Sequence, residues 1–183
     1  MTKTITAYLA TAGVAALMSL GAATASLADE LTDAQIIGIY SQVNSFDIET
    51  ALLGELMGAS DEVRAIGKMV SADHSGVRAA VHDIAEEIGV EPVLPPARIG
   101  AARDHDATIL ALRDLDGAAF DAAYLRHEVA FHQAAIEAVE QLLIPETESD
   151  VLKAHFEAVL PAFYHHLEMN MAAAETLNIS IEQ

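Results

Sequence analysis

Three histidines occupy positions where the helical pattern of apolar residues requires a hydrophobic side chain. His132 is the clearest case, because it fills the gap between Val129 and Ile136 on one stripe. His74 and His166 interrupt the stripes of the helices expected before and after it, although an adjacent histidine competes with His166 for the inward position. Imidazole nitrogens are common ligands of transition metals, so the three histidines are candidate ligands.

Carboxylates accompany these histidines in the same stripes. Glu128 precedes His132 by four residues, which places the two about 40° apart around a helix. In the first expected helix, Asp47 and Glu49 flank the apolar stripe on opposite edges, and the pattern does not choose between them. Because an unpaired buried charge is costly, a buried carboxylate is expected either to be paired or to bind a metal.

Two interpretations of this polar set remain open. Histidines and carboxylates that converge in a helical core are typical of a divalent metal site, here for zinc, iron or copper. The alternative is a metal-free protein in which Glu128 accepts hydrogen bonds from His74 or His132 and fixes helix register. A di-metal oxidoreductase is a third and weaker interpretation, and no motif indicates an enzyme.

Other polar residues are expected to support the site or to face solvent. Asp73 lies about 100° from His74 and is expected to be a supporting or surface acid. Tyr124, one turn before Glu128, is expected to be a core aromatic whose hydroxyl bonds to the site. The remaining candidates, His82, His105 and His155, are expected to be solvated.

The chain predicts an all-α fold with four long helices. Breaks at 58–60 and 145–148, with Thr32 and Ser60 as N-caps, place the helices at about 33–57, 60–88, 118–144 and 149–177. The short links predict two antiparallel hairpins, and Pro145 is expected to stop the third helix. The long connection 90–117 is expected to hold an exposed crossover at 93–104 and a short helix at about 104–115. One such crossover gives the ferritin-like four-helix bundle.

Residues 1–28 have the features of a signal peptide. Lys3 precedes an apolar stretch over 5–20, and the small residues Ser26 and Ala28 fit the cleavage rule, with Ala23 and Ala25 as a second option. We therefore expect export to the periplasm, no stable membrane insertion after cleavage, and one domain over 29–183. The chain has no cysteine, so disulfides and thiolate chemistry are excluded.

The charge of the chain restricts its partners. With 28 acidic against 9 basic residues the formal net charge is −19, which repels nucleic acid and anionic lipid surfaces. A homodimer and a protein partner stay open.

Motifs spread over all four expected helices resemble an exported bacterial family, domain of unknown function family 4142. They lie at 69–74, 117–124, 128–132, 143–145 and 160–167, and the resemblance covers about 32–176. It implies a ferritin-like fold, residence in the periplasm or outer envelope, and polar family positions at Asp47, Asp73, His74, Glu128, His132 and His166. The chain departs from the di-iron ferritins because its second helix has no Glu-x-x-His, so ferroxidase chemistry is not implied.

Overall fold

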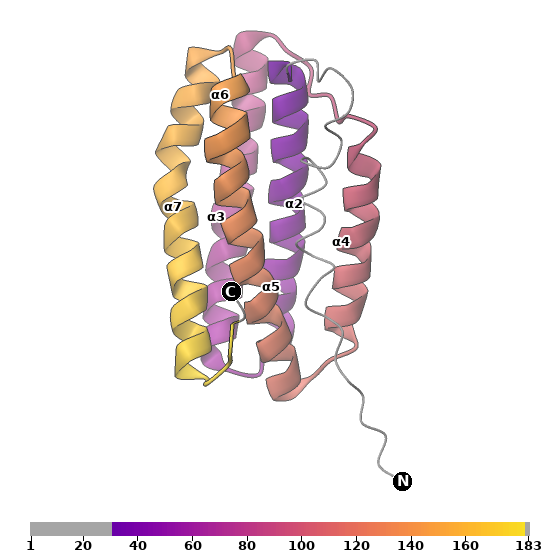
Figure 1. The fold of residues 1–183 in the computed structure, drawn as a ribbon, viewed down its shortest axis with the longest axis vertical. Coiled ribbons are helices and arrows are strands. Elements are labelled where there is room, and N and C mark those ends of the chain that lie inside the picture. The colour runs from indigo at the N-terminus through magenta and orange to yellow at the C-terminus, as the bar shows by residue number, and fades with distance from the viewer. Residues whose placement is uncertain (1–30, 182–183) are drawn as a thin grey trace.

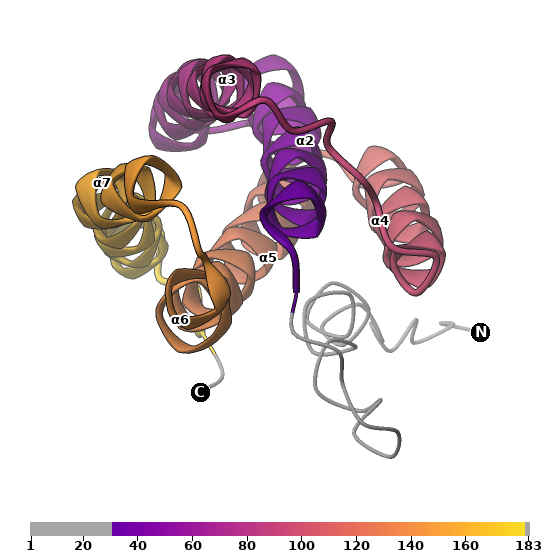
Figure 2. The same ribbon diagram turned by 90° about the horizontal axis from the view of Figure 1, so that it is seen from above.

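The computed structural model describes residues 31–181, and these residues contain helices and no strand. Four long helices lie side by side (Figure 1, Figure 2), as the sequence predicts. They are α2 (Asp33–Met57), α3 (Asp61–Ile88), α5 (Gly117–Ala138) and α7 (Asp150–Thr176). The all-α fold class is therefore confirmed.

A further helix, α4 (Arg98–Arg113), lies within the long connection. It runs back along the length of the molecule, so that α3 and α5 run in the same direction (Figure 1). The extra helix is confirmed, but the expectation that 90–104 is irregular is wrong from Arg98 onward. The carbonyls of Pro95 and Pro96 accept hydrogen bonds from the amides of Arg98 and Ile99, so the two prolines form the turn that leads into α4.

The end of α5 also differs from the expectation. A π-helical turn, η1 (Val139–Leu143), follows α5 and leads into the short α6 (Ile144–Glu146), so Pro145 does not stop the helix. Proline clashes with the carbonyl four residues earlier in a regular α-helix. The wider π-helical turn relieves this clash, because the amide of Ile144 donates to the carbonyl of Val139, five residues back, rather than to the one four residues back.

The helix starts follow the predicted capping chemistry. Thr32 forms a capping box with Gln35, and the side chains of Ser60 and Ser149 accept amide hydrogen bonds at the starts of α3 and α7. Each cap satisfies backbone donors that have no partner within the helix. These caps therefore mark where α2, α3 and α7 begin, whereas α5 follows Asp116 without a side-chain cap.

The core has a polar layer between two apolar clusters. One cluster contains Ile36, Ile37, Tyr40, Val81, Leu152 and Phe156, and the other contains Val63, Val70, Phe120, Tyr124, Leu125 and Ala174. Between them lie buried polar side chains from all four long helices. The two clusters hold the helices on both sides of the polar layer.

The lines along which neighbouring long helices meet, here called seams, are closed in different ways. At the α2–α3 seam the backbones approach closely, because a Cβ on Gly67 would lie 2.4 Å from the carbonyl oxygen of Ala51. The α2–α5 seam is covered by α4, whose Ala101 packs with Phe46 and Phe131. In Figure 2 no described helix covers the α3–α7 seam.

The predicted signal peptide, residues 1–28, lies outside the described residues. Within 31–181, no helix is both long enough and apolar enough to cross a membrane.

Candidate metal centre

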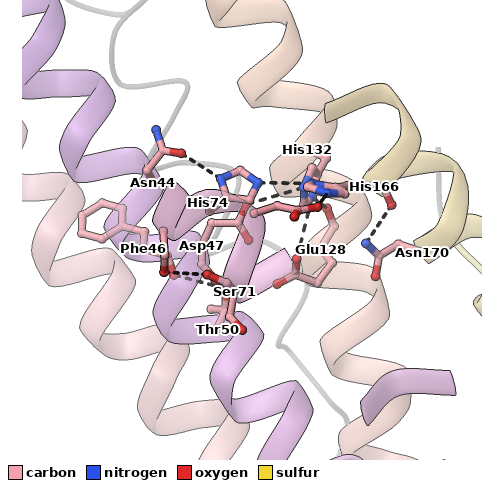
Figure 3. A network of polar contacts seen from close by, with 12 residues as sticks. Asn44, Phe46, Asp47, Thr50, Ser71, His74, Glu128, His132, His166 and Asn170 are labelled. Atoms are coloured by element: carbon pink, nitrogen blue, oxygen red, sulfur yellow. Dashed lines mark hydrogen bonds and ion pairs between the residues drawn. The ribbon is translucent and has the colours of Figure 1, made fainter. Parts of the chain in front are cut away.

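Five ionisable side chains from the four long helices meet in the polar layer (Figure 3). None is more than 3% exposed. They are Asp47 from α2, His74 from α3, Glu128 and His132 from α5, and His166 from α7. The sequence-predicted residues are thus brought together, with Asp47 rather than Glu49 as the acid from the first helix.

The potential ligand atoms lie at separations typical of a metal's coordination shell. Nε2 of His74 is 2.9 Å from Oδ2 of Asp47 and 3.3 Å from Nδ1 of His166, and Nε2 of His132 is 3.5 Å from the same Asp47 oxygen. Ligands bound about 2.1 Å from one ion lie about 3.0–3.5 Å apart. Two overlapping trios, His74–His132–His166 and Asp47–Glu128–His132, each keep their ligand atoms within 4.8 Å.

Each histidine has one ring nitrogen bonded to an acceptor outside the cluster. Nδ1 of His74 donates to the amide oxygen of Asn44 at 2.9 Å. Asn44 is oriented by its own NH₂ group, which donates to the carbonyl of Tyr40. Nδ1 of His132 donates to the backbone carbonyl of Glu128 at 3.0 Å.

The third histidine is fixed in the same manner, but by a charged group. Nε2 of His166 donates to the carboxylate of Asp73 at 3.0 Å. An amide oxygen, a backbone carbonyl and a carboxylate are all acceptors, so in every case the outer nitrogen carries the hydrogen. The inner nitrogens, Nε2 of His74, Nε2 of His132 and Nδ1 of His166, therefore turn lone pairs toward one another.

Several of the inner acceptor atoms lack a hydrogen-bond donor once the outer nitrogens carry the imidazole hydrogens. Both oxygens of Asp47, both oxygens of Glu128 and Nε2 of His132 are buried and make no hydrogen bond to the described residues. Nearly all buried polar atoms in proteins are satisfied, so a cluster of orphaned acceptors requires a physical reason. A cation among them is one such reason.

The two buried acids differ in their electrostatics. Burial alone would raise the pKa of Asp47, but the nearby histidines, His74 foremost, hold it below its usual range. Burial and the charge of Asp47 raise the pKa of Glu128 well above its usual value. Without a cation, the layer therefore favours one ionised and one protonated carboxyl group.

Burial favours the neutral form of two of the histidines, His132 and His166. It lowers the pKa of His132 to about 4 and lowers the pKa of His166 despite the bond to Asp73. Neutral imidazole is the form that binds a metal, so burial prepares these rings for coordination.

The supporting residues lie partly as expected. Asp73 is half exposed and contacts His166, in agreement with a supporting role. Tyr124 is fully buried, but its hydroxyl makes no hydrogen bond to the described residues, so the expected bond to the site is not found. Burial, then the charges of Glu128 and Asp47, raise its pKa.

Two expectations about solvated histidines are wrong. His105 is buried because the crossover helix α4 packs its ring against Phe46, and its Nε2 contacts the half-exposed Glu49 at 2.9 Å. His155 is half-buried against Tyr40, with a buried Nε2 that has no hydrogen-bond partner in 31–181. His82 is exposed, as expected.

Sequence reasoning missed the roles of the buried amides Asn44 and Asn170. Both donate to the carbonyl four residues earlier, and Asn44 also holds His74. The available signal was their spacing, because Asn44 is three residues before Asp47 and Asn170 is four after His166. Each shares a helix face with a ligand candidate.

The chain belongs to the family described as domain of unknown function (DUF4142), whose model matches residues 17–173. No curated protein and no solved structure matches the chain.

Proposed function

We propose that this protein is an exported, ferritin-like four-helix bundle that binds one divalent transition-metal ion in its core. The ligands would come from His74, His132 and His166, with Asp47 and Glu128. The support for export is the signal-like sequence of 1–28. The support for the ferritin-like class is the long connection that makes α3 and α5 parallel.

The observation that carries the metal proposal is the direction of the three imidazole rings. Each ring presents its hydrogen to an outer acceptor and its lone pair to the shared interior. Metal-binding histidines are typically held in this way by carboxylates, carbonyls or other outer acceptors. Unrelated core histidines have no reason to share this arrangement at one point.

Charge balance supports a single dication. Three neutral imidazoles with ionised Asp47 and Glu128 carry two negative charges, which one divalent ion cancels. A second dication would leave the buried layer with two positive charges, and a buried net charge is costly. Imidazole with carboxylate suits zinc, iron and copper, the metals we propose.

The metal-free alternative is a proton in place of the ion. Glu128 would keep its own proton beside Asp47, and a proton on Nε2 of His74 would pair with Asp47 and be shared with His166. It would leave Nε2 of His132 without a donor. A metal ion held by either trio, each of which includes His132, would supply the partner that this nitrogen lacks, and for this reason we favour it.

The closed ligand shell favours binding over catalysis. All the candidate donors are buried away from solvent, whereas catalytic metals keep a position open for water or substrate. The ion would therefore stabilise the bundle or be carried by it.

Elemental analysis and thermal melts test the proposal. Protein purified from the periplasm without a histidine tag should contain one metal ion per chain and lose thermal stability when a chelator removes it. A ligand at a hundredfold excess over its Kd stabilises the native state by about 2.7 kcal/mol. His132→Ala and Glu128→Gln should remove this metal-dependent increment, while His82→Ala, at an exposed histidine, should keep it.

One result would reject the proposal of a metal site. If the wild-type protein melts identically with chelator and with zinc, copper, iron or manganese, the polar layer is a metal-free network.

A further inference from the structure

A metal ion can reach this centre only by passing between helices, because the five candidate ligands are buried. The site therefore needs a passage, and the four seams between the long helices are the possible routes.

Three of these seams are blocked. The α2–α3 seam brings backbones into contact at Gly67, and Arg78 bridges its outer edge to the Ser45 hydroxyl. The α2–α5 seam lies beneath α4. The α5–α7 seam is bridged at both ends, by Tyr164 donating to Glu140 and by Arg126 donating to the carbonyl of Ser180 beyond α7.

The α3–α7 seam differs because its outer edge holds a polar group that contacts the centre. The Asp73 side chain is 51% exposed, yet its carboxylate is bonded to Nε2 of His166. The outer nitrogens of His74 and His132 are instead bound by buried acceptors, Asn44 and the carbonyl of Glu128. Among the three histidines, only His166 is therefore linked directly to solvent through its outer partner.

Helix α7 has a weak point beside this contact. Pro161, five residues before His166, has no amide hydrogen to donate to the carbonyl of Glu157. Helices bend most readily where such a bond is missing. A small movement of α7 at this point would separate His166 from α3.

We propose that the ion enters and leaves through the α3–α7 seam, where Asp73 binds it first and transfers it to His166. This inference rests on the proposed function. The carboxylate of Asp73 exchanges the hydrogen bond from Nε2 of His166 for the incoming cation, and the freed ring turns so that the lone pair of its Nδ1 takes the ion inward, while Nε2 keeps its hydrogen. Asp73 is thus an outer group for divalent cations, in addition to orienting His166.

Stopped-flow measurements with zinc and a chromophoric chelator test this role in the full mature chain. Asp73→Asn removes the charge but keeps an acceptor for His166. We expect association and dissociation to slow by the same factor, about tenfold, as for the loss of an attracting charge at a narrow approach. The Kd should change little, because a group on the passage acts equally on both directions.

Two control variants remove other exposed acids. Asp83→Asn makes the same charge change on α3, away from the contact with His166, and should leave both rates unchanged. Glu49→Gln makes the corresponding change beside α4, where Glu49 contacts His105. If Glu49→Gln slows exchange and Asp73→Asn does not, the ion passes beneath α4 and the inference is wrong.

The remaining outcomes separate the two proposals. A Kd weakened by about 10–100-fold with unchanged association would mean that Asp73 only orients His166, and would overturn the inference. Unchanged kinetics in Asp73→Asn would overturn it as well, while leaving the metal centre intact. If zinc does not bind the wild-type protein, the proposed function itself fails.

Discussion

The amide of Asn44 fixes the ring of His74 through two successive hydrogen bonds. Its NH₂ group donates to the carbonyl of Tyr40 at 2.8 Å, which leaves its oxygen to accept from Nδ1 of His74. The lone pair of Nε2 must then point into the cluster. A neutral residue that touches no metal thus decides which nitrogen of His74 is available.

Replacing this amide should weaken metal binding more than it weakens the fold. We expect Asn44→Ala to raise the Kd for zinc by about 10–100-fold, the usual effect of losing an outer partner of a ligating histidine. Asn170→Ala is the matched control, because Asn170 is also buried and also donates to the carbonyl four residues earlier, but contacts no imidazole nitrogen. Titration calorimetry on both variants checks this. Equal losses of affinity would show that any cavity in the layer has the same effect.

His155 should contribute to the pH dependence of stability. Burial lowers its pKa, so the unfolded chain, with a His pKa of about 6.5, binds the proton more readily than the folded chain does. The stability that depends on neutral His155 is therefore complete above about pH 6.5 and is lost as the pH falls below that value.

Denaturant melts between about pH 7.5 and 5 test this at fixed metal content. His155→Gln should lose less stability on acidification than the wild type, whereas His82→Gln, at an exposed position, should follow the wild type. An unchanged slope in His155→Gln would exclude this residue as a source of acid sensitivity.

For single residues, the sequence predicted the inward histidines and Glu128 because each interrupts a long apolar stripe. It did not choose between Asp47 and Glu49, because both lie on the edges of one stripe and only packing against α3 and α5 selects one. His105 was assigned to solvent because its environment comes from Phe46, 59 positions earlier in the chain.

Two glycines on α3 separate helix propensity from helix packing. Ala is favoured over Gly in a helix interior by about 0.5–1 kcal/mol. Gly76 meets open space, so Gly76→Ala should stabilise the protein by about that amount. A Cβ on Gly67 would lie 2.4 Å from the backbone of α2, so Gly67→Ala should destabilise it despite the better propensity.

Chemical denaturation of the two variants measures the difference directly. Both make the same substitution in the same helix, so any common effect on the unfolded chain cancels. Stabilisation of both variants would mean that α2 and α3 do not approach each other closely at Gly67.

Element boundaries were predictable where capping residues specify them. Thr32 and Ser60 mark the starts of α2 and α3, and Gly89, with φ 72°, ends α3. The prolines gave the wrong prediction at two boundaries, the start of α4 and the end of α5. Pro95 and Pro96 lie in the turn that leads into α4 rather than exclude a helix there, and Pro145 is accommodated by a π-helical turn. A proline does not reveal from sequence alone whether a helix will start, widen or end.

In the whole molecule, the polar layer divides the core into two apolar halves. Each half has its own large buried side chains, Tyr40 and Phe156 in one, Phe120 and Leu125 in the other. Burial of these apolar surfaces stabilises the fold on both sides of the layer, so the packing of the helices does not depend on the polar layer alone. The layer therefore carries a cost in stability that a bound cation would offset.

The location of the protein depends on whether its first residues are removed. We expect the mature chain to begin at Asp29, because Ser26 and Ala28 occupy the small-residue positions before the cleaved bond. This cut leaves Thr32 intact, so the capping box of α2 survives processing. N-terminal sequencing of the protein from the periplasmic fraction decides it.

Ala28→Phe should block processing at this bond and Ala28→Ser should permit it, since signal peptidase requires a small residue there. A start at Ser26 would select the alternative site after Ala25, and an intact Met1 would contradict export by cleavage.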